Sequence, residues 1–346
     1  MELTADHREL QDLVRGFFAE HVSSEYLRKR IESGARSDGA LIETLSQLGL
    51  REGFCGPDAA LSVVELSLVA QECGRVLMPE PVWERLLCEG LVERLLAESE
   101  AKELISFLGD ARTALAPQEC CSLSCDAKGK VLSGDISWAT GGMGAGRVFA
   151  VATLGNSSRV VCFNAAGAGV KPIELPSLDL STALTGYAIK KEPCLVLSEG
   201  ASMLLLDLVE ILKASEAYGI TSRVIEFTTE YVKTREQFGV PVGGFQAIQH
   251  KLADCYSQSE ALGALARFAA WSVEHSPEQR PLTARSAMSQ AAQVAPHVCE
   301  VAMQCHGGIG FTWEYELHLF LRRAKLIQMA FPNSERRAGE LIARAR

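Results

Sequence analysis

Hydrophobic side chains recur every three or four residues from residue 1 to about 105, which is the spacing of helices with one buried face. The first such stretch follows Thr4 and Asp6, which are candidate N-caps. A later stretch ends before Pro79 and Pro81, because proline cannot continue a helix. The pattern predicts an all-helical domain over residues 1–108.

The pattern changes twice along the rest of the chain. Between residues 109 and 197, glycine and β-branched residues become frequent, and short apolar segments such as Arg159–Phe163 are bounded by turn residues. From 198 to 346 long helical patterns return, and Gly219 allows a close approach between helices. Helices of this length form a four-helix bundle. The predicted fold is a multi-domain α+β protein with a helical domain, a small central β-barrel or β-sandwich and a C-terminal bundle.

One turn between two of the predicted long helices carries an unusual set of side chains. Glycines and a proline interrupt the helical pattern between Tyr231 and Asp254. Arg235 offers a planar fork of donors that suits a phosphate, while Gln237 adds an amide and Phe238 a flat apolar face. Together these groups suit a dinucleotide, although an Arg in a last helical turn is commonly only a partner for the helix dipole.

A second candidate binding loop lies nearer the C-terminal end. Gln304 falls at the predicted end of a helix, and Gly307 and Gly308 follow it. A loop without side chains lets backbone N–H groups reach a phosphate, but glycines between helices are more often simple turns. In the last predicted helix, Arg323 is placed near the C-terminal end, where the helix dipole favours a cation.

Composition and charge exclude several classes of function. The chain has 346 residues, of which 47% are hydrophobic and 22% charged, as in ordinary globular proteins. The net charge of -9 argues against nucleic acid as the main partner. No apolar run approaches the ~20 residues of a membrane span, and the first residues do not resemble a signal peptide. Eleven cysteines without paired metal-ligand spacing fit buried thiols in a reducing cytoplasm, so we expect no metal site.

The two candidate loops, together with Tyr315 and the Arg-Arg-Ala-Lys segment 322–325, resemble motifs of the acyl-CoA dehydrogenase family of flavoproteins. The resemblance runs through nearly the whole chain in order. It implies an FAD cofactor, an acyl-CoA thioester substrate and an electron-transfer flavoprotein as acceptor. We call the turn with Arg235, Gln237 and Phe238 the Arg-Gln-Phe corner. In that family this corner binds the FAD of a neighbouring subunit, which implies an oligomer. The cofactor-binding residues implied are Arg235, Gln237, Phe238, Val242, Phe245, Ile248, Gln304, Gly307, Gly308, Trp138 and Thr140.

Trp138 and Thr140 belong to a segment, Leu132–Thr140, that resembles the flavin-facing strand of the family. Strand alternation places both side chains on one face. Without the resemblance, Trp138 reads as a core anchor. The segment before it departs from the family pattern: a Thr-Glu-Pro sequence and a Gly/Ser-rich loop are replaced by Ala114–Glu119 and two cysteines.

The base that the family reaction needs is absent from its usual place. Removing the α-proton of a thioester requires a positioned carboxylate. Most family members carry it just after the Arg-x-Ala-Lys helix, where this chain has Phe331. A minority carry it on an earlier helix, at the position of Val209. Its neighbour Glu210 is the remaining candidate, although one residue is a rotation of about 100° on a helix and an exposed surface role is the alternative.

Three hypotheses remain open. The leading one is a subunit of a heteromeric α2β2 acyl-CoA dehydrogenase whose partner supplies the base, similar to short bacterial subunits that oxidise bulky thioesters such as steroid side chains. The second is a self-sufficient homo-oligomeric enzyme that uses Glu210 or another displaced carboxylate. The third is an inactive structural or regulatory paralogue. A cytoplasmic location in a bacterium is expected.

Overall fold

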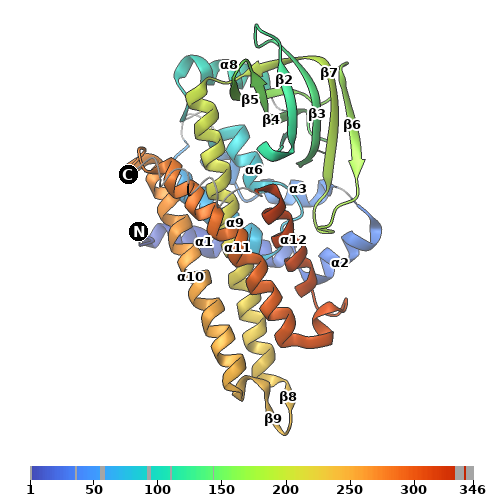
Figure 1. Cartoon of the computed structure of the whole chain (residues 1–346), viewed down its shortest axis with the longest axis vertical. Coiled ribbons are helices and arrows are strands. Elements are labelled where there is room, and N and C mark those ends of the chain that lie inside the picture. The colour runs from blue at the N-terminus through green and yellow to red at the C-terminus, as the bar shows by residue number, and fades with distance from the viewer. Residues whose placement is uncertain are drawn as a thin grey trace.

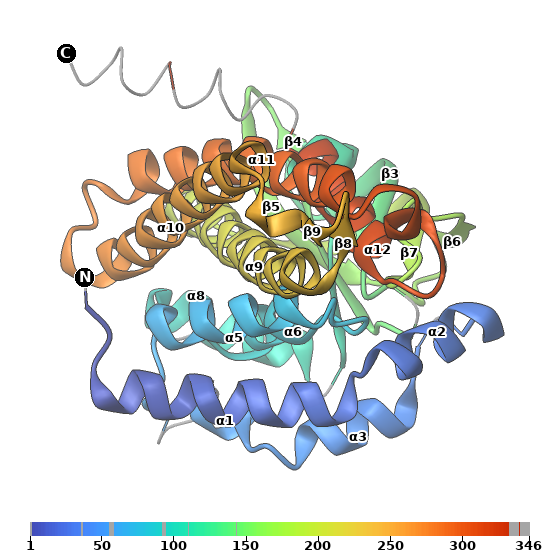
Figure 2. The ribbon, with the colours of Figure 1, turned by 90° about the horizontal axis from the view of Figure 1, so that it is seen from below.

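The computed structural model describes residues 2–35, 37–54, 59–91, 95–109, 111–142, 144–331 and 339. Its N-terminal part is helical, and Thr4 begins the first helix through a capping box with His7. Figure 2 shows α1 and α3 as a layer beneath α5 and α6, and α5 packs against α9. The elements are α1 (Ala5–His21), α2 (Ser24–Ser33), α3 (Gly39–Ser46), α4 (Leu50–Phe54), α5 (Val63–Arg75), α6 (Val82–Leu86), the π-helical turn η1 (Leu87–Leu91) and α8 (Glu98–Leu108).

A seven-stranded sheet forms one end of the molecule (Figure 1). Strands β3, β2, β4, β5 and β7 pair in this order, and β7 pairs back with β3, so the sheet closes into the predicted small barrel. Phe163 and Tyr187 fill its interior. The elements are β1 (Thr113–Leu115), the 3₁₀ turn η2 (Gln118–Cys120), β2 (Cys121–Cys125), β3 (Val131–Thr140), β4 (Arg147–Leu154), β5 (Ser157–Asn164), β6 (Val170–Leu175) and β7 (Leu184–Val196).

The C-terminal part is the predicted four-helix bundle. Helix α9 is central and packs against α10, α11, α12 and α5. A short hairpin, β8–β9, caps the end of the bundle remote from the barrel (Figure 1). The elements are α9 (Glu199–Thr234), β8 (Glu236–Gln237), β9 (Val240–Pro241), η3 (Val242–Gly244), α10 (Gln246–His275), α11 (Arg280–His306), η4 (Gly307–Phe311) and α12 (Leu317–Ala330). Within the described residues, no helix is long and apolar enough to cross a membrane.

Two glycines allow α5 and α9 to cross in close contact. A Cβ atom on Gly219 would lie 1.8 Å from the carbonyl oxygen of Gln71, and one on Gly74 would lie 2.0 Å from that of Glu216. Backbone therefore packs directly on backbone, which confirms the close approach predicted for Gly219. The crossing holds Glu216 at the junction of the N-terminal helices and the bundle.

Candidate functional site

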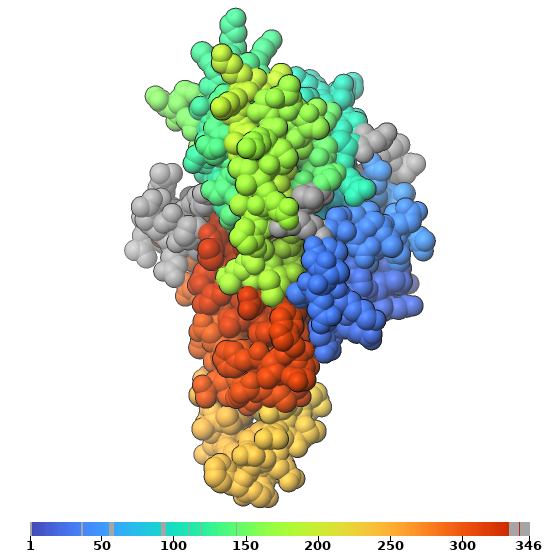
Figure 3. Space-filling view, turned by 90° about the vertical axis from the view of Figure 1, so that its right-hand side faces the viewer, coloured from blue at the N-terminus to red at the C-terminus, as the bar shows by residue number. Residues whose placement is uncertain are grey.

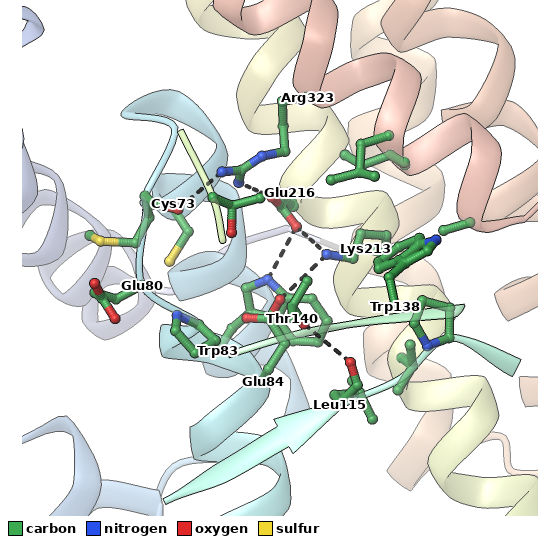
Figure 4. Close-up of a pocket in the computed structure, with 18 of the residues that line it drawn as sticks. Cys73, Glu80, Trp83, Glu84, Leu115, Trp138, Thr140, Lys213, Glu216 and Arg323 are labelled. Atoms are coloured by element: carbon green, nitrogen blue, oxygen red, sulfur yellow. Dashed lines mark hydrogen bonds and ion pairs between the residues drawn. The ribbon is translucent and has the colours of Figure 1, made fainter. Parts of the chain in front are cut away.

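A cleft lies where the barrel, α6, α9 and α12 meet (Figure 4). Trp138 and Thr140 of β3 both line it, in agreement with the prediction that they share one face of a strand. Val209 of α9 and Phe331 at the end of α12 line it from the bundle. The cavity measures only about 40 Å³, which is room for about three water molecules.

Charged side chains fill much of the cleft. The carboxylate of Glu216 accepts hydrogen bonds from Trp83 Nε1 at 3.2 Å, Lys213 Nζ at 2.8 Å and Arg323 Nη1 at 2.8 Å. Lys213 Nζ also lies 4.5 Å from the centre of the Trp83 ring and 3.5 Å from Glu84 Oε1. We call Trp83, Glu84, Lys213, Glu216 and Arg323 the cleft cluster, and Figure 4 shows these five residues converging from both sides.

Arg323 ties the cleft cluster to the connection between β6 and β7. Its guanidinium pairs with Asp179, donates to Ser181 Oγ at 3.0 Å and donates to the carbonyl of Met78 at 3.3 Å. The prediction that Arg323 lies near the end of the last helix was wrong. Helix α12 extends to Ala330, so Arg323 lies in its middle. Its side chain is only 6% exposed, and the buried acceptors around it make this burial possible.

Electrostatic coupling keeps the cleft cluster charged. Burial would raise the pKa of Glu216, but Lys213 and Arg323 hold it at about 2. Burial would lower the pKa of Lys213, yet the carboxylates of Glu216 and Glu84 raise it above its ordinary value. For Glu84, burial is the largest effect and raises the pKa. The cleft cluster is therefore a closed ion-pair network, with Lys213, Glu216 and Arg323 charged at neutral pH.

The two candidate base positions differ in their surroundings. Phe331 is 6% exposed and lines the cleft where the family resemblance places a carboxylate. Glu210 is 3% exposed, so its alternative interpretation as an exposed helix residue was wrong. It lines an adjoining cavity of about 20 Å³ beside the barrel, and its carboxylate pairs with Arg285 of α11. A paired carboxylate is a weaker proton acceptor, and Glu210 does not line the main cleft, although its neighbour Val209 does.

The Arg-Gln-Phe corner lies on the β8–β9 hairpin and is open to solvent. Arg235 ends α9, and Arg235 and Gln237 are exposed. Phe238 is 94% exposed at a φ of 56°, and Gly239 follows at 81°, as in a two-residue hairpin turn of type I′. In the space-filling view this end of the bundle protrudes from the molecule (Figure 3).

The second loop belongs to the same part of the bundle as the corner. The ring of His306, next to Gly307, stacks on Tyr231 one turn before Arg235, with the ring centres 4.2 Å apart. We call the corner and this loop together the end group. Its predicted members also include Val242 in η3, Phe245 at the start of α10 and Ile248 in the first turn of α10. The remaining members, besides Arg235, Gln237 and Phe238, are the exposed Gln304, Gly307 and Gly308.

The predicted cofactor residues thus form two separate groups. The end group offers a guanidinium, amides, an exposed ring and open glycine backbone, which fits the diphosphate and adenine part of FAD. The cleft beside Trp138 and Thr140 does not fit a flavin ring, because its 40 Å³ is far below the ~150 Å³ that holds even one benzene ring. One copy of the chain, in this conformation, does not enclose the whole cofactor.

The cleft cluster was missed by the sequence interpretation. Its local signal is Lys213 and Glu216, an oppositely charged pair three residues apart in a mostly apolar stretch of α9. Trp83 and Glu84 lie in the part of the chain for which the sequence predicted only a helical domain. Their contacts to α9 join segments about 130 residues apart, and the spacing of residues does not reveal such contacts.

A helical layer, a closed β-barrel and a four-helix bundle around one cleft define the acyl-CoA dehydrogenase fold. Residues 202–345 match the family described as "Acyl-CoA dehydrogenase, C-terminal domain". Acyl-CoA dehydrogenase IpdE2 of Mycobacterium tuberculosis is 29% identical over 322 residues, which cover 91% of this chain and 89% of the relative. Residues 202–345 thus match the C-terminal domain of the acyl-CoA dehydrogenases, a family of flavin-dependent oxidoreductases, and the whole chain is similar to members of this family in sequence and fold.

Solved structures agree along the full length. A chain of the "Tcur3481-Tcur3483 steroid ACAD G363A variant" superposes with a TM-score of 0.86 at 27% identity, covering 98% of both chains. A chain of the ChsE4-ChsE5 complex from Mycobacterium tuberculosis superposes with a TM-score of 0.83 at 21% identity, covering 99% of this chain and 98% of that one. The second similarity shows the fold alone.

Proposed function

We propose that this chain is one subunit of a heteromeric, FAD-dependent acyl-CoA dehydrogenase. In this assembly the end group contacts an FAD molecule held mainly by a partner chain, and the partner supplies the catalytic base. The observation that carries the proposal is the filled cleft. Trp83, Lys213 and Glu216 occupy the space beside Trp138, and Phe331 stands where the base is expected.

The relatives support the same proposal. Two of the similar solved structures are named as pairs of proteins, and one of these is called a steroid ACAD. A thioester with a bulky acyl group of steroid origin is therefore the substrate class that we propose. The end group, exposed at the tip of the bundle, is the part of this chain best placed to reach a neighbouring subunit.

The chemistry of the residues suggests which step of the reaction each chain supports. Dehydrogenation of a CoA thioester removes the α-proton to a base, and FAD, when bound, accepts the hydride from the β-carbon. Arg235 can hold a phosphate through two N–H donors, and Phe238 can cover an adenine ring. The cleft cluster leaves room for only a few water molecules in this chain's own cleft, which is too little space for an acyl chain. Proton removal is therefore assigned to the partner.

Turnover of the separated chains tests the proposal. We expect no acyl-CoA oxidation by this chain alone, and activity when it is combined with an acyl-CoA dehydrogenase chain encoded beside it. Arg285 keeps its ion pair with Asp207 in Glu210→Gln, so the activity of the folded complex should stay within about twofold, as should that of the control Glu230→Gln on the exposed part of the same helix. Activity of this chain alone that disappears in Glu210→Gln would instead establish a self-sufficient enzyme.

A further inference from the structure

A second cavity, here called the outer chamber, lies between α3, α4 and α6. It measures about 180 Å³, against about 40 Å³ for the cleft. Its walls are mainly apolar, with Ile42 and Leu45 from α3, Leu50 from α4, and Val82 and Leu86 from α6. Because an apolar cavity of about 150 Å³ holds a benzene molecule, the outer chamber has room for a six-membered ring or a short branched chain.

Charged side chains at the outer chamber decide which apolar molecules suit it. Arg85 donates to both carboxylate oxygens of Glu89, at 2.9 and 3.1 Å, and Glu80 lies 2.9 Å from Arg30. These four charges cancel in pairs. Arg51 of α4 also lines the chamber, is exposed, and makes no ion pair with a described residue. Of the charged side chains that line the chamber, Arg51 is therefore the one left without an oppositely charged partner among the described residues.

We propose that the outer chamber binds a small carboxylic acid whose apolar body is about the size of a six-membered ring. The body would lie between Leu45 and Leu86, and the carboxylate would meet the guanidinium of Arg51, whose two parallel N–H groups match a carboxylate. This site is separate from the cleft and from the end group. The proposal does not depend on the oxidation chemistry assigned above.

The outer chamber and the cleft share a wall. Val82 and Leu86 of α6 face the chamber, whereas Trp83 and Glu84 of the same helix face the cleft. Pro81 lines both cavities. A ligand in the chamber therefore presses on the segment that holds Trp83, so its binding should change the tryptophan fluorescence of the chain.

Titration of the full chain with cyclohexanecarboxylate, followed by calorimetry and by fluorescence, tests the proposal. We expect saturable binding at one site. Cyclohexylmethanol, which has the same ring but no charge, should bind roughly tenfold more weakly, the effect of one hydrogen-bonded charge. In Arg51→Gln the acid should lose this advantage and bind about as weakly as the alcohol. The control Arg8→Gln, on the exposed side of α1, should bind like the wild type.

A variant that fills the chamber locates the site. Leu45 is only partly buried, so Leu45→Trp can place its ring in the chamber without displacing the core, and it should abolish binding of both compounds. Circular dichroism checks that this variant is folded, while Arg51→Gln tests the charge independently. Absence of saturable binding, survival of binding in folded Leu45→Trp, or equal affinity of the wild type for acid and alcohol would overturn the proposal.

Discussion

Replacing Glu216 by Gln should destabilise the protein strongly, although the side chain keeps its size. The substitution leaves Lys213 and Arg323 buried beside a neutral amide. Removing one member of a buried ion pair costs about 3–5 kcal/mol. The pKa of Glu216 gives an independent figure: the difference between about 2 and the ordinary 4.5 corresponds to about 3 kcal/mol. The two routes agree on about 3 kcal/mol or more.

Urea unfolding at pH 7, followed by circular dichroism, measures this cost. The matched control is Glu230→Gln on the same helix, because Glu230 also pairs with a lysine three residues away but is 72% exposed. That change should cost about 0.5 kcal/mol or less. Adding Lys213→Met to Glu216→Gln should recover part of the lost free energy of unfolding, since it removes a buried cation that has lost the nearer of its two carboxylates. If Glu216→Gln costs no more than Glu230→Gln, the closed network does not exist in solution.

Three further predictions address the helix crossing, the corner and the pH dependence. Gly219→Ala should lower the free energy of unfolding by about 3 kcal/mol, whereas Gly200→Ala, in open space on the same helix, should raise it by about 0.5–1 kcal/mol. Equal urea midpoints for the two variants would contradict the close contact between α5 and α9. Arg235→Ala should lower the amount of flavin that the assembled complex retains on gel filtration roughly tenfold, without changing the unfolding midpoint. The control Arg8→Ala should change neither the retained flavin nor the midpoint. Because burial lowers the pKa of His306, the free energy of unfolding should fall as the pH drops below about 6.5; His306→Phe should flatten that dependence between pH 7.5 and 5.5.

Much of the fold could be predicted because its signals are local. Periodic hydrophobic positions marked the long helices, and prolines and glycines marked where they end, as at Pro79 before α6. Pairing of β3 with β7, which closes the barrel, joins residues about 50 positions apart, so the sequence predicted short strands in a barrel or a sandwich but not which strands pair. The domain limits at 108/109 and 197/198 stay predictions; they fall next to the ends of α8 and β7.

In the candidate site too, only the residues that lie together in one short segment could be predicted. Arg235, Gln237 and Phe238 could be predicted because one short turn contains them all. The cleft cluster could not, since α6, α9 and α12 each contribute charged groups whose partners are distant in sequence. Glu210 illustrates the limit: one position along α9 separates it from Val209, and this rotation decides which of the two lines the main cleft.

The most direct test of the central claim is the flavin stoichiometry of this chain, purified alone and in complex with its partner. The filled cleft predicts no bound flavin for the chain alone. With the partner it predicts one FAD for every two chains, bleached by acyl-CoA. A yellow preparation of this chain alone, with one FAD per chain that acyl-CoA bleaches, would contradict the account, because the cleft would then have to open and accept the flavin ring unaided.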